Sequence, residues 1–149
     1  MRSLFQLLLR LVFRHPVPGT SIIPFLEDGR IILVRRQDTK LWALPGGMVK
    51  WREDIALTVQ RELYEETGLN LVRIRQLVGV YSASDRDPRL HSICFVVAAD
   101  VNGQINIQDK YEICEVRAFR LEELPEMKEL SFDNGQQLQN YLKGLTVVL

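Results

Sequence analysis

Four glutamates and one arginine lie close together in a short stretch of the sequence: Glu53, Arg61, Glu62, Glu65 and Glu66. On a helical wheel, Glu62, Glu65 and Glu66 fall within roughly 100° of arc. Like charges on one helix face repel, so helix stability does not explain them. Carboxylate oxygens are the ligands that Mg²⁺ and Mn²⁺ prefer, and these ions also bind phosphate oxygens. The pattern predicts a divalent-metal site that activates water against a phosphorus atom.

The alternative interpretation is a solvated acidic face paired with neighbouring lysines and arginines. For a single pair of glutamates this is the usual case, because most charge runs are exposed surface. Here four glutamates lie on or before one helix and follow the Gly46-Gly47 turn. This arrangement favours the metal site.

The acidic residues are positioned by a helix predicted from Asp54 to Thr67. Asp54 can cap its start and Gly68 can end it. Apolar residues recur at four-residue spacing along the same segment, at Ile55, Val59 and Leu63. Since this stripe lies beside the acidic one, we expect the carboxylates at the rim of the packed face, lining a cleft.

The remaining segments alternate as strands and one further helix. Residues 20–26 and 31–36 predict a hairpin through the Asp28-Gly29 turn. Further strands are expected at 71–82, 90–100 and 113–121, with a turn at Asn102-Gly103. A last helix is expected from near Ser131 to Lys143-Gly144, with Leu138, Tyr141 and Leu142 on its packed side. This order predicts a mixed β-sheet between helices, an α/β (α+β) sandwich.

The spacing around the helix resembles a known family. Gly47, five residues, Glu53, seven residues and then Arg61-Glu62-Leu63-Tyr64-Glu65-Glu66-Thr67-Gly68-Leu69 satisfy every fixed position of the Nudix box. The chain is therefore identified as a member of the Nudix hydrolase family. The resemblance implies an α/β/α Nudix sandwich, and it extends more loosely over residues 18–143.

The resemblance also implies roles for individual residues. The metal ligands would be Gly47, through its carbonyl, with Glu62, Glu65 and Glu66. Glu53 would be a further ligand or a positioner of water. Arg61 would clamp the glutamates, a task suited to its planar fork.

Arg52 departs from the pattern, because many relatives carry glycine before the first glutamate of the box. A positive φ there would cost Arg52 on the order of 1 kcal/mol. Alternatively, Arg52 adds charge next to the phosphates. Both interpretations stay open at this stage.

Substrate choice in the family usually depends on residues outside the box. The segment Asp85-Arg86-Asp87-Pro88-Arg89 resembles one found in ADP-ribose pyrophosphatases, and Arg86 or Arg89 would hold a phosphate or ribose. The alternative is a turn held by its own salt bridges. Arg35 and Arg52 are further substrate-binding candidates.

A downstream acidic residue often serves the family as base or extra metal ligand. Glu112 is the first candidate and Glu115 the second. Ala118 stands where relatives often place tryptophan, which weakens the case for base stacking from its strand. The remaining stacking candidates are Phe25, Trp42 and Trp51, with core packing the expected role of the first two.

The resemblance implies hydrolysis of the diphosphate linkage of a nucleoside diphosphate joined to another group, with Mg²⁺ or Mn²⁺ as cofactor. ADP-ribose or another ADP-sugar is the leading substrate. One alternative is a MutT-like hydrolase of oxidised nucleoside triphosphates. The other is a sensor that binds such a metabolite without cleaving it, which the intact box disfavours.

Composition sets the outer limits. The 149 residues predict one domain, 1–149, with an apolar helix at 1–14 and a Nudix core at 18–143. The net charge of zero disfavours a nucleic acid polymer as partner. Cys94 and Cys114 are predicted to be buried, reduced thiols of a cytoplasmic protein.

The apolar run Leu4–Phe13 needs separate mention. It is far shorter than the ~20 residues that cross a bilayer, so no transmembrane segment is expected. We expect this run to pack on the domain or on a second subunit of a homodimer. The alternative is a helix lying in a membrane interface.

Overall fold

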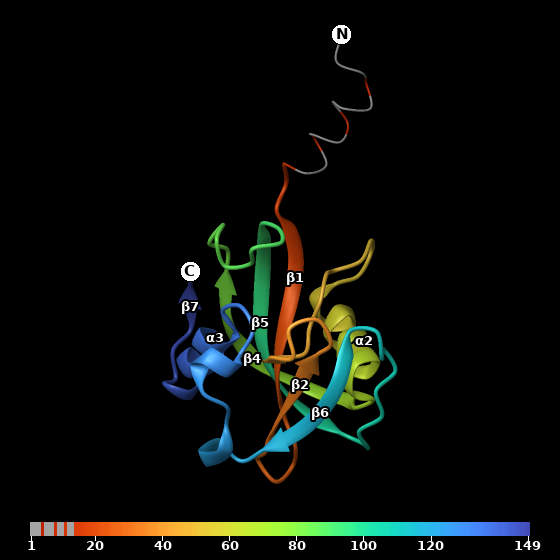
Figure 1. Ribbon diagram of the computed structural model, residues 1–149, viewed down its shortest axis with the longest axis vertical. Coiled ribbons are helices and arrows are strands. Elements are labelled where there is room, and N and C mark those ends of the chain that lie inside the picture. The colour runs from red at the N-terminus through yellow and green to blue at the C-terminus, as the bar shows by residue number, and fades with distance from the viewer. Residues whose placement is uncertain (1–3, 5–7, 9–10, 12–13) are drawn as a thin grey trace.

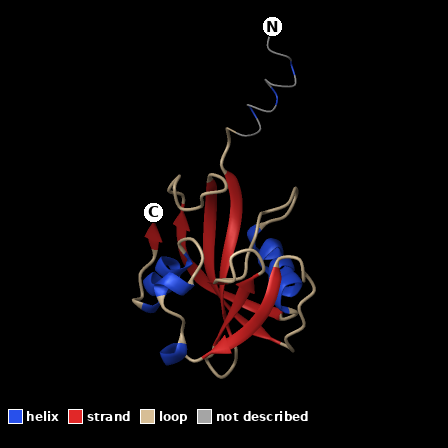
Figure 2. Ribbon diagram, viewed as in Figure 1, coloured by secondary structure: helices blue, strands red, loops and turns tan. Residues whose placement is uncertain are grey.

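The computed structural model describes Leu4, Leu8 and Leu11 together with residues 14–149. A seven-stranded mixed sheet lies between two helices, α2 and α3 (Figures 1 and 2). The predicted packing of the helix at 1–14 lies almost entirely outside the described residues. Within them, no helix has the length and apolar character needed to cross a membrane.

The elements in chain order are β1 (Val17–Phe25), β2 (Ile31–Arg36), β3 (Trp42–Ala43), α2 (Ile55–Thr67), β4 (Asn70–Tyr81), β5 (Ser92–Asn102), β6 (Ile113–Phe119), the 3₁₀ turns η1 (Leu121–Glu123) and η2 (Met127–Glu129), α3 (Asn134–Leu142) and β7 (Val147–Val148). The strand order is β3-β2-β1-β5-β4-β7, and β6 pairs with β2. Strand β1 runs parallel to β5, and β4 runs parallel to β7. The other strand pairs are antiparallel.

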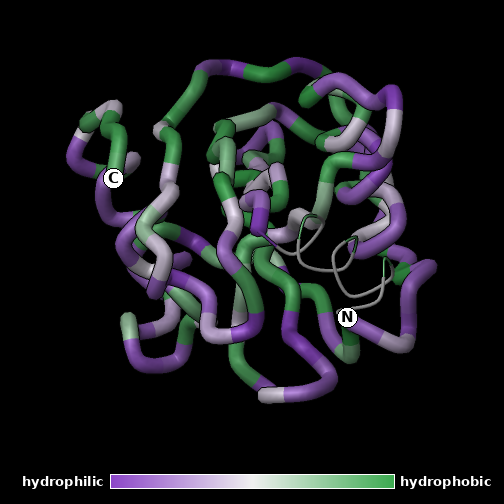
Figure 3. The backbone as a smooth tube through the Cα atoms, turned by 90° about the horizontal axis from the view of Figure 1, so that it is seen from above, coloured by the Kyte–Doolittle hydropathy of each residue, from purple (hydrophilic) through white to green (hydrophobic). Residues whose placement is uncertain are grey.

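Alternation along the central strands builds a core on each side of the sheet. Ile22 and Ile32 are fully buried with Val59 and Leu63 of α2. Their neighbours Ile23 and Leu33 point to the other face, where Leu138 of α3 packs. In Figure 3 apolar segments run through the centre of the molecule, while much of its outer boundary is hydrophilic. The predicted α/β/α sandwich is confirmed.

Helix α2 begins and ends where local signals placed it. The Asp54 side chain accepts a hydrogen bond from the Leu57 N–H at 2.8 Å. Gly68 adopts a left-handed φ of 77° and donates its N–H to the Tyr64 carbonyl at 2.8 Å. The hairpin between β1 and β2 is also present, and Gly29 has a φ of 85° in its turn. These features confirm the predicted helix and the predicted hairpin, although β1 begins at Val17, three residues before the expected start at Thr20.

Two expectations about packing and two about the elements need correction. Cys94 is buried, but Cys114 is exposed, because it is the residue left without a partner at the bulge between the pairs Arg35↔Glu115 and Arg36↔Ile113. Leu142 ends α3 and is 47% exposed, so Leu138 and part of Tyr141 carry the packing of that helix. The helix also begins at Asn134 rather than near Ser131, and the short strands β3 and β7 were not expected.

Candidate active site

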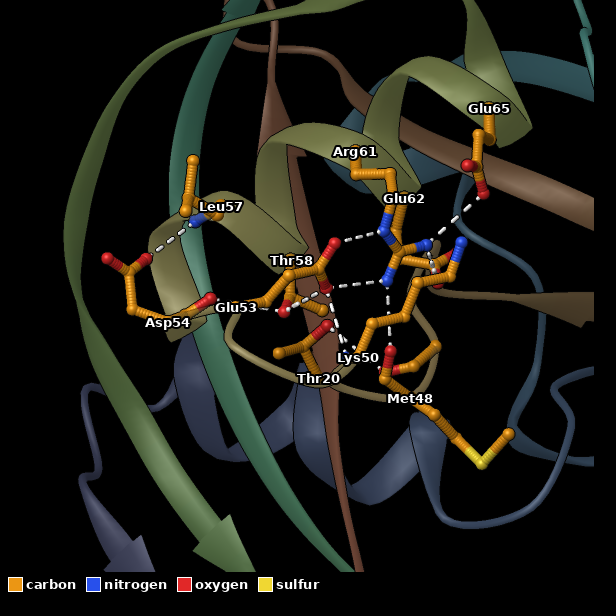
Figure 4. Close-up of polar contacts among 11 residues, drawn as sticks. Thr20, Met48, Lys50, Glu53, Asp54, Leu57, Thr58, Arg61, Glu62 and Glu65 are labelled. Carbon is orange, nitrogen blue, oxygen red and sulfur yellow. Dashed lines mark hydrogen bonds and ion pairs between the residues drawn. The ribbon is translucent and has the colours of Figure 1, made fainter.

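Arg61 occupies the centre of the acidic cluster (Figure 4). Its Nε and Nη2 donate to the two carboxylate oxygens of Glu53 at 2.7 and 2.9 Å. Its Nη1 donates to Glu62 at 2.6 Å and to Glu65 at 3.3 Å. Nη2 also reaches the Met48 carbonyl at 3.0 Å. One planar guanidinium therefore fixes three carboxylates and the loop before the helix, as a clamp would.

The hydrogen bonds from Arg61 stabilise the charged form of their main partner, Glu53. They lower the pKa of Glu53 to about 2, with help from the Lys50 N–H and the Thr58 hydroxyl. The pKa of Arg61 rises for the same reason. Glu53 is therefore ionised throughout the neutral range and serves as a fixed anchor for the clamp.

Glu66 is the most buried acid of the cluster, with 5% of its surface exposed. The Gly46 N–H donates to its Oε2 at 3.0 Å, and that is the one hydrogen bond its carboxylate accepts within the described chain. Burial raises the pKa of Glu66 well above its ordinary value, and the charges of Glu62 and Glu112 add to this. A buried carboxylate with so little compensation is a position where a cation would be stabilising.

The loop containing Gly46 and Gly47 is built against strand β1. Thr20 donates its N–H to the Gly47 carbonyl, and Ile22 donates its N–H to the Pro45 carbonyl, both at 2.8 Å. A Cβ at Gly46 would overlap the backbone of β1, and one at Gly47 would overlap the carboxylate of Glu62. Glycine is needed at position 46 because the backbone of β1 approaches too closely for any side chain, whereas a side chain at position 47 would displace the Glu62 carboxylate.

The donor set fits a hard divalent cation, although the ligands are not gathered into a finished shell. Within the described residues, no three acidic, histidine or cysteine side chains converge as a ready-made metal cluster. Arg61 holds Glu62 and Glu65, and the Gly46 N–H holds Glu66. The fit depends on carboxylate oxygens, above all those of Glu66, which is buried and accepts one hydrogen bond within the described chain. The set Gly47, Glu62, Glu65 and Glu66 stays a prediction.

The two downstream acids differ in their surroundings. Glu112, just before β6, is close enough that its charge raises the pKa of both Glu62 and Glu66. Glu115 pairs instead with Arg35 at 3.4 Å and with Arg117 at 2.5 Å. The charge of Glu112 therefore acts on the cluster, whereas Glu115 is paired with Arg35 and Arg117.

A cavity of about 130 Å³ adjoins Gly46 and Gly47. Of the four arginines considered for the substrate, Arg86 and Arg89 line it, and Arg35 and Arg52 do not. Arg36 also lines the cavity and was not foreseen. A bulge between Arg35 and Arg36 shifts the pairing of β2 with β6 at this point, which simple alternation along a strand does not reveal.

The aromatic candidates differ in burial and in their position relative to the cavity. Phe25 and Trp42 are buried in the core, as expected. Trp51 is 92% exposed and lies outside the cavity. Phe132, in the connection before α3, lines the cavity instead. It was not singled out from the sequence, where no local motif surrounds it.

Comparison with known proteins agrees with the fold and shows the family. The family model described as the NUDIX domain matches residues 15–141. The chain belongs to this family, and its class is that of the Nudix hydrolases. It is 36% identical over 136 residues to an ADP-ribose pyrophosphatase of Methanocaldococcus jannaschii, an alignment covering 89% of this chain and 76% of the relative.

Two solved structures extend the comparison. A MutT NUDIX hydrolase from Burkholderia pseudomallei superimposes with a TM-score of 0.72 at 28% identity, covering 85% of this chain and 98% of the other. A bifunctional NMN adenylyltransferase/ADP ribose pyrophosphatase from Francisella tularensis, complexed with AMP and a Mn ion, gives 0.75 at 26% identity. That alignment covers 94% of this chain and 45% of the other. The predicted family and fold are confirmed.

Proposed function

We propose that this Nudix hydrolase cleaves the diphosphate linkage of a nucleoside diphosphate joined to another group, with ADP-ribose as the leading substrate. The observation that carries the proposal is the buried carboxylate of Glu66, which accepts a hydrogen bond from the N–H of Gly46, a residue that lines the cavity together with Gly47. The name of the Methanocaldococcus relative supports ADP-ribose as the first compound to test.

The cofactor in this proposal is Mg²⁺ or Mn²⁺, held by the Gly47 carbonyl and by Glu62, Glu65 and Glu66. The Mn ion in the Francisella structure supports this choice. When bound, such an ion neutralises phosphate charge and lowers the pKa of coordinated water. The buried carboxylate of Glu66, which has no ion pair within the described residues, then gains a positive charge beside it.

The protein's own residues would orient the reaction. Arg61 holds Glu53, Glu62 and Glu65 in fixed directions. Glu112 takes a proton from the attacking water. The water oxygen then bonds to phosphorus, and the bridging P–O bond breaks. Attack on ADP-ribose in this way yields AMP and ribose 5-phosphate. Arg86 and Arg89 belong to the wall that receives the organic part of the substrate.

A second candidate is hydrolysis of oxidised nucleoside triphosphates. The similarity to the Burkholderia MutT hydrolase supports it. The two substrates differ in charge, because a nucleoside triphosphate carries one more phosphate group than ADP-ribose.

One assay separates these activities. Purified protein with Mg²⁺ is given ADP-ribose, other ADP-sugars, NADH and 8-oxo-dGTP, and kcat/KM is measured for each. We expect ADP-ribose or another ADP-sugar to lead. A preference for 8-oxo-dGTP by about tenfold or more, some 1.4 kcal/mol, would favour the MutT-like function. Glu66→Gln, purified in parallel, controls for contaminating hydrolases.

The cytoplasmic location and the homodimer stay predictions. Cell fractionation tests the first, and light scattering of the purified chain tests the second.

A further inference from the structure

Thr58 is a polar residue of helix α2 that has no exposed surface. The residue after it, Val59, is apolar and packs in the core beneath the helix. A hydroxyl group without access to water destabilises a fold unless it finds a hydrogen-bond partner inside the protein. The contacts of the Thr58 hydroxyl therefore indicate its role.

Two acceptors lie within reach of this hydroxyl. Its Oγ1 is 2.9 Å from Oε2 of Glu53 and 3.1 Å from the main-chain carbonyl oxygen of Asp54. That carbonyl already accepts the N–H of Thr58 at 3.0 Å, as in any α-helix. A hydroxyl has a single proton to donate, and the charged carboxylate is the stronger acceptor. The hydroxyl therefore donates to Glu53.

Glu53 receives hydrogen bonds from three residues. Arg61 donates to both of its carboxylate oxygens, and the Lys50 N–H donates to Oε2 at 3.1 Å. Dashed lines in Figure 4 join the Glu53 carboxylate to Thr58 as well as to Arg61. Of these two donating side chains Thr58 is the more constrained, because it is short, β-branched and fully buried, whereas Arg61 is long and partly exposed.

Arg61 extends this orientation to the rest of the acidic cluster. Its Nε and Nη2 pair with Glu53, while its Nη1 donates to Glu62 at 2.6 Å and to Glu65 at 3.3 Å. Because a guanidinium is planar, fixing Nε and Nη2 also fixes the direction of Nη1. The Thr58 hydroxyl is thus connected, through Glu53 and Arg61, to two of the proposed metal ligands.

We propose that Thr58 is a positioning residue of the proposed active site, whose hydroxyl fixes the carboxylate of Glu53 and, through it, the guanidinium of Arg61. Where it concerns turnover, the inference rests on the proposed function. Where it concerns the orientation of Arg61, it is tested without substrate or metal.

The first test measures how firmly Arg61 is held in the full chain. Nuclear magnetic resonance follows the exchange of the Arg61 Nε proton with water, and the absence of the signal from Arg61→Lys assigns it. Thr58→Val keeps the shape of the side chain and removes the donor, so exchange should be about tenfold faster, as expected for the loss of one hydrogen bond. Thr58→Ser keeps the hydroxyl and should stay within about threefold of wild type.

The second test measures turnover of ADP-ribose with Mg²⁺. In Thr58→Val, kcat should fall about tenfold, because the clamp no longer holds the carboxylates in one orientation. KM should stay within about twofold, since Thr58 does not line the cavity. Thr58→Ser should restore kcat to within about threefold of wild type.

A double variant tests whether Thr58 acts through the clamp. Thr58→Val/Arg61→Lys should have a kcat within about twofold of that of Arg61→Lys alone, since both changes disrupt the same set of contacts. If Thr58 served only the general stability of the helix, the two losses would multiply.

Thr67→Val is the matched control, because Thr67 is also fully buried in α2. Its hydroxyl donates to the Leu63 carbonyl and accepts the Leu69 N–H, so it does not touch the clamp. This variant should leave the exchange of the Arg61 Nε proton unchanged. Thermal melting shows whether each variant is folded, and Thr58→Ala is a second variant without the hydroxyl if Thr58→Val does not fold.

Four results would overturn the inference: wild-type exchange at Arg61 in folded Thr58→Val, a wild-type kcat in that variant, equal losses in Thr58→Ser and Thr58→Val, or multiplied losses in the double variant. Failure of the proposed function looks different. Wild type would then hydrolyse none of the nucleotides, while Thr58→Val would still speed the exchange at Arg61.

Discussion

The guanidinium of Arg61 donates a hydrogen bond to each carboxylate oxygen of Glu53, at 2.7 and 2.9 Å. Lysine cannot reproduce this geometry, because its ammonium offers a point charge without a planar fork. Arg61→Lys should therefore keep the charge of the cluster and still lower kcat.

Losing one charge-assisted hydrogen bond typically costs about 1.5–3 kcal/mol, or roughly 10- to 100-fold in rate if the orientation matters only in the transition state. Steady-state kinetics with ADP-ribose measures the effect. Arg30→Lys, in an exposed pair with Asp28, is the control and should behave as wild type. An unchanged kcat in Arg61→Lys would show that Arg61 only balances the charge of the glutamates and does not orient them.

The second prediction concerns the buried acid. Glu66→Gln should lower turnover at least about a hundredfold, since it removes a charged ligand from the proposed metal site. It should not unfold the protein, because the carboxylate it replaces is buried with little compensation. Mg²⁺ should raise the melting temperature of wild type and have a much smaller effect on the variant.

Glu65→Gln should give a similar loss of turnover. Glu122→Gln, in the η1 turn away from the cluster, is the matched control for removal of one glutamate charge. Should folded Glu66→Gln keep Mg²⁺-dependent activity near the wild-type level, the ligand assignment would be wrong.

Arg52 has a φ of 67°, so the position before the first box glutamate does require the left-handed region. Arg52→Gly should relieve on the order of 1 kcal/mol of strain and raise the melting temperature by a few degrees. Lys50→Gly is the control, because Lys50 is not among the residues with positive φ and glycine there should destabilise.

Arg52→Gly also tests whether the Arg52 side chain contacts the substrate. The side chain does not line the cavity, so KM for ADP-ribose should stay within about twofold. A rise in KM with the expected gain in stability would show that the charge of Arg52 also contacts substrate.

The pair of Arg86 and Asp133 should be structural as well as part of the cavity wall. Their side chains are 9% and 14% exposed, so Arg86→Ala leaves a nearly buried carboxylate without its partner. Breaking such a pair typically costs about 3–5 kcal/mol, and we expect a matching fall in unfolding free energy by urea titration.

Arg89→Ala is the comparison, because its side chain is 52% exposed and its pair should contribute at most about 1 kcal/mol. Arg89→Ala should mainly raise KM and spare kcat.

The double variant Arg86→Ala/Asp133→Ala should recover part of the stability that Arg86→Ala loses. A double variant no more stable than Arg86→Ala alone would contradict the buried-pair argument.

The sequence was sufficient for features set by local rules. The bounds of α2 follow from a cap at Asp54 and a left-handed glycine at Gly68, both visible as residue types. The runs at 20–26 and 31–36, joined by the Asp28-Gly29 turn, predicted the hairpin that β1 and β2 form. The resemblance to the Nudix box implied that Arg61 would clamp the glutamates, and Arg61 contacts three of the four, Glu53, Glu62 and Glu65.

Features that depend on distant partners could not be foreseen. Whether Arg86 was free to bind phosphate depended on Asp133, which is 47 residues away in the sequence. The place of Arg36 depended on a bulge in its pairing with another strand. Phe132 reaches the cavity through a positive φ that no glycine or asparagine signals.

The parallel ladder between β1 and β5 bears on how the chain folds. Its paired residues, from Val17↔Ser92 to Phe25↔Asp100, are about 75 residues apart in the sequence. Such non-local pairing slows folding, because a long loop must close before its contacts form. The Gly46-Gly47 loop hydrogen-bonds to this same β1 strand. Refolding should therefore build helix α2 early from local contacts, and enzymatic activity should return only with the slow closure of the central ladder.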